Sequence, residues 1–131
     1  MNVFEALHET PGALAVSAGD LEALFTRDDA VTALFFAGER DRTGESADVA
    51  VVLRELVRAH PGRLRAGLME AADERKLKAL FGVSTTPTLV FVRGRATLGA
   101  IERMKGWDHY AARVEELLAE PATLHAEATL Q

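Results

Sequence analysis

The sequence predicts a single α/β domain in which a central mixed β-sheet is flanked by helices. Its 131 residues suit one compact core and are too few for two ordinary domains. Short apolar runs alternate with segments of helical periodicity, an order that favours parallel strands joined by helices. The last two apolar runs are separated only by Arg93-Gly94-Arg95, where glycine permits a tight hairpin, so we expect those two strands to be antiparallel.

The first expected elements precede residue 38. Asn2 and Glu5 have the spacing of a capping box, which predicts a short opening helix. The apolar run 31–37 is typical of a strand that is buried on both faces of a parallel sheet. The expected elements are a helix before Pro11, strands over 13–16 and 31–37, and a helix over 20–27 that begins at Asp20 and buries Leu21, Leu24 and Phe25.

The remaining elements follow the turn-prone segment 38–46. One helix is expected to end at His60-Pro61-Gly62, and the next to begin at Asp73 and end at Gly82. Their buried faces should hold Val49, Val52, Leu53, Leu56 and Val57 in the first helix, and Leu77, Leu80 and Phe81 in the second. The other expected elements are strands over 64–69, 88–92 and 96–101 and a closing helix over 107–119. We expect a domain over residues 1–120 and a frayed tail over 121–131.

The composition excludes several kinds of chemistry. The chain has no cysteine, so disulfide exchange, thiolate zinc sites and thiol nucleophiles are excluded. No glycine-rich phosphate-binding pattern occurs, and Asp28-Asp29 is typical of a turn rather than of acid–base chemistry. The four histidines, which have no paired spacing and are interpreted as surface residues without a metal, are His8, His60, His109 and His125. We therefore expect neither a cofactor, a metal nor an enzymatic activity.

The charge and the N-terminus bear on partners and location. A net charge of −5 disfavours nucleic acid and mildly favours a cationic partner, although ordinary solubility is the more common reason for such a charge. Residues 1–10 lack the basic start and apolar core of a signal peptide. No run approaches the roughly 20 apolar residues that a membrane helix needs. We expect a cytoplasmic protein that does not insert into membranes.

One segment carries a resemblance to a known fold. The segment FGVSTTPTLVFVRG, residues 81–94, resembles thioredoxins, whose matching segment contains a cis-proline before the fourth strand. The resemblance implies a thioredoxin-like fold of order β-α-β-α-β-α-β-β-α and a cis peptide bond between Thr86 and Pro87. Such a turn bares backbone groups with which an extended peptide can pair, although it is also simply the turn that this fold requires. Active thioredoxins carry a Trp-Cys-Gly-Pro-Cys loop, which would fall within residues 38–44, and neither cysteine is present here.

A narrower resemblance covers most of the chain. The sequence is similar to the HyaE/HoxO/HupG family, cysteine-free thioredoxin-like accessory proteins for the maturation of bacterial membrane-bound nickel–iron hydrogenases. The residues that carry it are 15–17 (AVS), 40–43 (RDRT), 52–56 (VLREL), 81–83 (FGV) and 86–91 (TPTLVF). The resemblance implies a chaperone that binds the small-subunit precursor with its twin-arginine signal peptide before export. Other hydrogenase accessory proteins are further implied partners.

The candidate contact residues gather around the former active-site loop. Carboxylates can bind an arginine pair by bidentate, charge-assisted hydrogen bonds, but acids at this place are equally typical of a solvated loop and a helix start. Trp107 is either an exposed aromatic anchor or a staple between the last helix and the sheet. The candidate partner-binding residues are Glu39, Asp41, Glu45, Asp48, Thr86, Pro87 and Trp107.

Two other functions remain open. One is a transferase-like protein that binds glutathione or another thiol at Thr86-Pro87, although the chain lacks the helical second domain that such transferases usually carry. The other is a peptide- or protein-interaction module, or a homodimer, that serves an unrelated complex.

Overall fold

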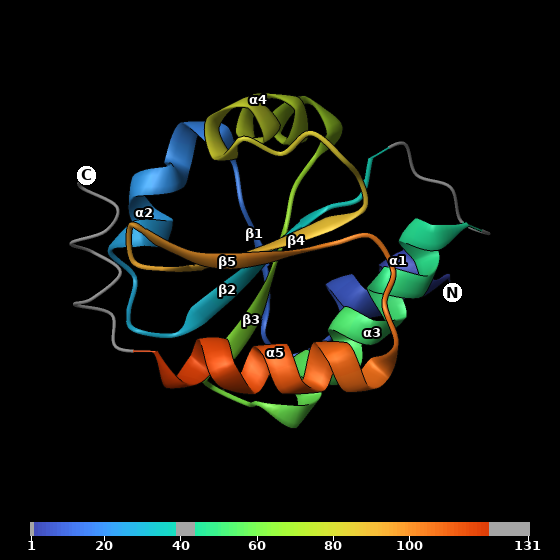
Figure 1. The fold of residues 1–131 in the computed structure, drawn as a ribbon. Helices are drawn as coiled ribbons and strands as arrows, with labels where there is room; N and C mark the ends of the chain where they lie inside the picture. The colour runs from blue at the N-terminus through green and yellow to red at the C-terminus, as the bar shows by residue number, and fades with distance from the viewer. Residues whose placement is uncertain (1, 39–43, 121–131) are drawn as a thin grey trace.

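The computed structural model describes residues 2–38 and 44–120 (Figure 1). A five-stranded sheet of order β1-β3-β2-β4-β5 forms its centre. β1, β3 and β2 are parallel, whereas β4 is antiparallel to both β2 and β5. The strands are β1 (Ala13–Ala15), β2 (Val31–Phe36), β3 (Leu64–Leu68), β4 (Thr88–Arg93) and β5 (Ala96–Glu102). The predicted mixed α/β fold is confirmed; the expected tail, 121–131, lies outside the described residues.

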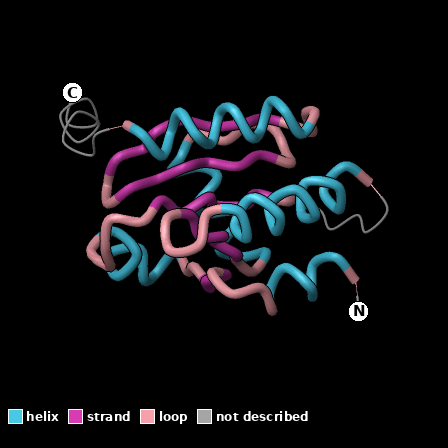
Figure 2. Tube along the Cα trace, turned by 90° about the horizontal axis from the view of Figure 1, so that it is seen from below, coloured by secondary structure: helices cyan, strands magenta, loops and turns pink. Residues whose placement is uncertain are grey.

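Helices cover both faces of the sheet. α4 and α2 lie above it in Figure 1, and α1, α3 and α5 lie below. Figure 2, viewed from below, shows α5, α3 and α1 side by side across the lower face. The helices are α1 (Val3–His8), α2 (Leu21–Phe25), α3 (Glu45–Ala59), α4 (Ala71–Phe81) and α5 (Trp107–Ala119), with a 3-10 turn, η1 (Ala18–Asp20), before α2.

The central strand β2 divides the core into two clusters. Because side chains alternate between the faces of a strand, Ala33 and Phe35 pack with α1, α3 and α5 below the sheet. Leu34 and Phe36 pack above it with residues of α2 and α4. All six residues of β2 are buried, as predicted from its unbroken apolar run. The lower cluster is the larger of the two.

The short helix α1 begins at the predicted Asn2 cap, although the Glu5 carboxylate accepts from the Asn2 side-chain amide, whereas a full capping box uses the Asn2 backbone N–H. The side chain of Asn2 accepts a hydrogen bond from the Glu5 backbone N–H at 2.9 Å and donates to the Glu5 carboxylate at 3.1 Å. Phe4 and Leu7, one turn apart, are buried against the lower face of the sheet. The cap therefore begins a helix whose apolar stripe closes the N-terminal end of the core.

Three expectations about local structure are wrong. The helix expected over 20–27 is shorter: it begins at Leu21, directly after η1, and ends at Phe25, and its apolar side chains are only partly buried. Leu80 is 64% exposed, since α4 packs through Glu74, Leu77 and Phe81 and Leu80 lies roughly a quarter turn to the side. His60 is not a surface residue: its side chain is 12% exposed, and its Nε2 lies 3.9 Å from Glu115 of α5.

No helix within residues 2–38 and 44–120 has the length and apolar character to cross a membrane.

Candidate binding site at the end of the central strands

A buried carboxylate holds the end of β2. Glu74 of α4 is 9% exposed, and its two oxygens accept hydrogen bonds from the backbone N–H groups of Ala37 at 3.0 Å and Gly38 at 2.9 Å. The Ser46 hydroxyl of α3 donates to the Ala37 carbonyl at 2.5 Å. Side chains from helices on both faces of the sheet therefore fix the chain where it leaves β2.

Sequence reasoning did not single out Glu74 or Ser46. The position of Glu74 in the sequence could have indicated its burial. It precedes Leu77 and Phe81 at the spacing of one helix face, so it lies where an apolar residue is expected. A carboxylate on a buried helix face needs hydrogen-bond donors, because an unpaired buried charge is costly. The donors, which directly follow β2, lie 37 and 36 residues away in the sequence, and no local pattern identifies them.

Thr86 and Pro87 lie beside this strand end. Their peptide bond is cis. Pro87 is buried and Thr86 is half-buried. Gly38 has a φ of +75°, and a Cβ added there would collide with the Thr86 hydroxyl. The end of β2 and the turn before β4 are therefore packed too closely for a side chain at residue 38.

The turn is also tied to the segment after β5. The Arg103 backbone N–H donates to the Pro87 carbonyl at 2.7 Å, and the Thr88 hydroxyl donates to the Thr85 carbonyl at 2.8 Å. The Pro87 carbonyl is thus already bonded within the chain, so it is not among the backbone groups of this turn that an incoming peptide could reach. Arg103 itself has a left-handed φ of +65°.

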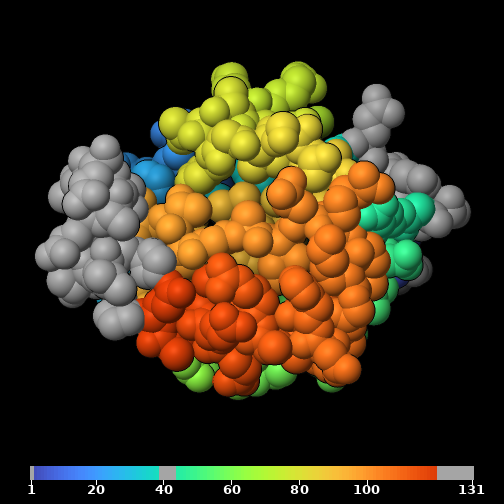
Figure 3. Space-filling view, in the orientation of Figure 1, coloured from blue at the N-terminus to red at the C-terminus, as the bar shows by residue number. Residues whose placement is uncertain are grey.

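Glu45 forms the third part of this frame. Its carboxylate accepts hydrogen bonds from the Arg103 guanidinium at 2.7 and 2.5 Å and from the Met104 backbone N–H at 2.8 Å. The hydrogen bonds from Arg103, followed by the one from Met104, lower the pKa of Glu45 from 4.5 to about 2. In Figure 3 the segment around residues 100–107 packs against the start of α3. Glu45 therefore joins α3 to the segment after β5 and does not offer a free carboxylate.

Tyr110 supports the same segment from α5. Its side chain is fully buried, and its hydroxyl donates to the Arg103 carbonyl at 2.9 Å and accepts from the Lys105 backbone N–H at 3.3 Å. Burial raises the pKa of the Tyr110 hydroxyl above its ordinary value of 10. The segment from Arg103 to Lys105 is therefore held from below by α5 and from the side by α3.

The other candidate residues are not all gathered at this place. Asp48 is exposed in the first turn of α3. Trp107 is 46% exposed and lies beside Glu55 and Ala59, about 15 Å along α3 from Glu45, so the interpretation as a staple onto the sheet is wrong. Glu39 and Asp41 lie outside the described residues.

The polar side chains at the strand end bond to backbone groups or to each other. Within residues 2–38 and 44–120, no three histidine or acidic side chains gather closely enough to hold a metal ion. On the surface beside this frame, Asp48 presents an exposed carboxylate.

Comparison with known proteins identifies the family to which the chain belongs. The family model described as "Hydrogenase-1 expression protein HyaE" matches residues 3–110. The hydrogenase expression/formation protein HupG of Bradyrhizobium diazoefficiens is 42% identical over 92 residues, which are 70% of this chain and 62% of that protein. HoxO of Azotobacter vinelandii is 44% identical over 86 residues, 66% of this chain and 57% of that protein. The chain therefore matches about three fifths of these relatives' own lengths.

Solved structures agree with both the family and the fold. HupG of Rhodopseudomonas palustris, described as a hydrogenase expression/formation protein, is 39% identical with a TM-score of 0.54, over 80% of this chain and 94% of that one. Chloroplastic thioredoxin z is 17% identical with a TM-score of 0.65, over 82% of this chain and 96% of that one, and it shows the fold alone. The resemblance stated from the sequence is confirmed: this chain belongs to the HyaE family of hydrogenase-1 expression proteins.

Proposed function

We propose that this protein is a cytoplasmic assembly chaperone that acts in hydrogenase expression and formation by binding the precursor of a nickel–iron hydrogenase small subunit. In this proposal the precursor carries a twin-arginine signal peptide and is held before export, without redox catalysis. The observation that carries the proposal is membership of the HyaE family by a chain with no cysteine. A thioredoxin-like fold without thiols can still bind another protein through its surface, but it cannot exchange disulfides.

The charges near the start of α3 support an arginine-bearing partner. Asp48 is exposed, and Glu39 and Asp41 stand a few residues before it in the sequence. Arginine binds carboxylates by paired, charge-assisted hydrogen bonds, which suits recognition of two neighbouring arginines. Glu45 contributes less than Asp48 to binding the partner's arginines in this proposal, because the Glu45 carboxylate is already hydrogen-bonded to Arg103.

The direct test is binding of the purified small-subunit precursor, measured by biolayer interferometry with and without its signal peptide. We expect binding of the precursor and weaker binding once the signal peptide is deleted. An Asp48→Asn variant, with Glu39→Gln and Asp41→Asn added, should weaken binding about tenfold or more. Asp108→Asn removes one exposed carboxylate from α5 and is the matched control for Asp48→Asn alone; it should leave affinity unchanged.

Two results would count against the proposal. Failure of the intact precursor to bind would refute it outright. Equal affinity for the precursor with and without its signal peptide would move recognition to the folded body of the small subunit and remove the proposed role of the arginine pair.

A further inference from the structure

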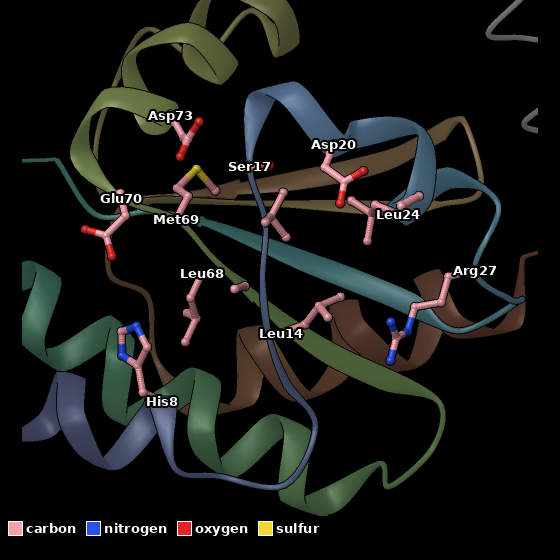
Figure 4. Close-up of a pocket in the computed structure, with 13 residues that line it drawn as sticks. His8, Leu14, Ser17, Asp20, Leu24, Arg27, Leu68, Met69, Glu70 and Asp73 are labelled. Atoms are coloured by element: carbon pink, nitrogen blue, oxygen red, sulfur yellow. The ribbon is translucent and has the colours of Figure 1, made fainter.

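A cavity of about 500 Å³ lies beside β1, the edge strand of the sheet (Figure 4). It is lined by β1 itself and by the end of β3, with α1, α2 and the start of α4 around its rim. Leu14, Leu24 and Met69 supply apolar surface within it. We call this cavity the β1 groove. It is separate from the Thr86–Pro87 turn, because β3 and β2 lie between β1 and β4 in the sheet.

The groove runs along backbone groups that face away from the sheet. β1 bonds to β3 through the Gly12 carbonyl and the Val16 N–H. Because successive residues of a strand direct their backbone groups to opposite sides, Ala13 and Ala15 direct theirs to the outer edge. The Ala13 N–H is taken by the Thr10 carbonyl at 3.0 Å. Ala15, which is exposed and lines the groove, therefore presents both an N–H and a carbonyl to an incoming strand.

Charge is distributed unevenly around the groove. Figure 4 shows Asp20, Glu70 and Asp73 around the carboxyl end of β1, with Arg27 toward its opposite end. One oxygen of Asp73 accepts a hydrogen bond from the Ala18 backbone N–H at 2.9 Å, which orients this carboxylate beside the groove. Three carboxylates therefore stand at one end of the groove and one guanidinium at the other.

His8 adds a further acceptor to the rim. Its Nδ1 lies 2.9 Å from the Phe4 carbonyl, which can only accept a hydrogen bond, so Nδ1 carries the proton. In the neutral ring Nε2 is then an acceptor. The His8 side chain lines the groove, so this acceptor lies on the groove's rim.

We propose that the β1 groove binds an extended polypeptide segment, which adds to β1 as a further strand and places basic side chains beside Asp20, Glu70 and Asp73. Backbone pairing at a free sheet edge provides affinity for any extended segment, and the flanking side chains select among sequences. The excess of carboxylates selects for lysine or arginine at one end of the segment and against acids there. The inference does not depend on the proposed function, because it rests on another part of the sheet.

The first experiment uses ¹⁵N-labelled full-length protein and synthetic peptides of about six residues, the length of an ordinary strand. The binding peptide alternates valine and threonine and ends in two arginines. We expect chemical-shift changes at residues 13–17 and along the groove. A peptide with glutamates in place of the arginines, and one with every second amide N-methylated, should each bind at least about tenfold more weakly.

Variants of the protein separate charge from backbone pairing. Asp20→Asn combined with Glu70→Gln should weaken binding about tenfold, whereas Glu102→Gln with Asp108→Asn removes the same charge elsewhere and should change it less than about twofold. Ala15→Pro removes only an outward-facing N–H, a substitution that edge strands tolerate, and should abolish binding. The peptide comparisons need no variant, so they decide the question even where a substitution unfolds the protein.

Four results would overturn the inference. The first is no binding of the arginine peptide. The second is shift changes centred on the amides of Thr86 and Thr88 in place of β1, and the third is equal affinity for the glutamate or the N-methylated peptide. The fourth is a dimer in sedimentation that Ala15→Pro disrupts, because a second copy of the chain would then fill the groove.

Discussion

Replacing Glu74 tests whether a buried carboxylate holds the end of β2. In the Glu74→Ala variant the N–H groups of Ala37 and Gly38 lose their acceptors. A buried donor without a partner costs about 1–3 kcal/mol, so for the two donors together we expect the free energy of unfolding to fall by about 2–6 kcal/mol. Glu74→Gln keeps one acceptor oxygen and should cost about half as much.

Urea denaturation, followed by far-UV circular dichroism, measures this loss, and amide hydrogen exchange locates it. Exchange at Ala37 and Gly38 should accelerate more than exchange at the centre of β2. Glu70→Gln is the matched control, because Glu70 is exposed at the start of the same helix and should change stability by less than about 0.5 kcal/mol. A Glu74→Ala variant that unfolds at the same urea concentration as the unmodified protein would refute the reasoning.

Three further predictions concern the same frame and its core. Gly38→Ala should destabilise the protein by about 1–3 kcal/mol in urea denaturation, because its φ of +75° disfavours a side chain that would also collide with its neighbour; an unchanged midpoint would contradict this. Glu45 has a folded pKa of about 2 against an ordinary 4.5, so its pairing with Arg103 stabilises the fold above about pH 4.5 and is lost as the pH falls toward 2. Thermal melts across that range should fall less steeply for Glu45→Gln, and parallel curves for the two proteins would exclude the effect. Leu77→Ala should cost about 2–5 kcal/mol whereas Leu80→Ala should cost almost nothing, and similar losses at the two positions would mean that α4 packs on a different face.

The candidate site was only partly predictable from the sequence. The cis turn at Thr86–Pro87 could be predicted from the resemblance to thioredoxins. The acidic residues before and within the start of α3 can be read directly from the sequence. The structure pairs Glu45 with Arg103, 58 residues later in the chain, and uses it to join two segments. The same tertiary packing places Trp107 on the side of α3, so an aromatic residue at a helix start remains exposed.

The β1 groove shows a related limit. Ala13 to Val16 is visible in the sequence as a short apolar strand, but nothing local shows that it forms the edge of the sheet. The strand order belongs to the tertiary structure, and that order leaves the outward groups of Ala15 beside Asp20 and Asp73. Residues that are scattered over 66 positions, from His8 to Asp73, form one rim only because of this order.

The sequence by itself determined the alternation of strands and helices, the burial of β2 on both faces, the span of α5 and the exclusion of thiol chemistry. These properties depend on periodicity, on capping residues and on the absence of cysteine, all of which are local or compositional. Tertiary structure alone decided that Glu74 is buried, that Glu45 is paired and that Leu80 is exposed. The physical reason is that the burial and the hydrogen-bond partners of a residue depend on which helices and strands pack together. Those packing contacts join residues that are far apart in the chain.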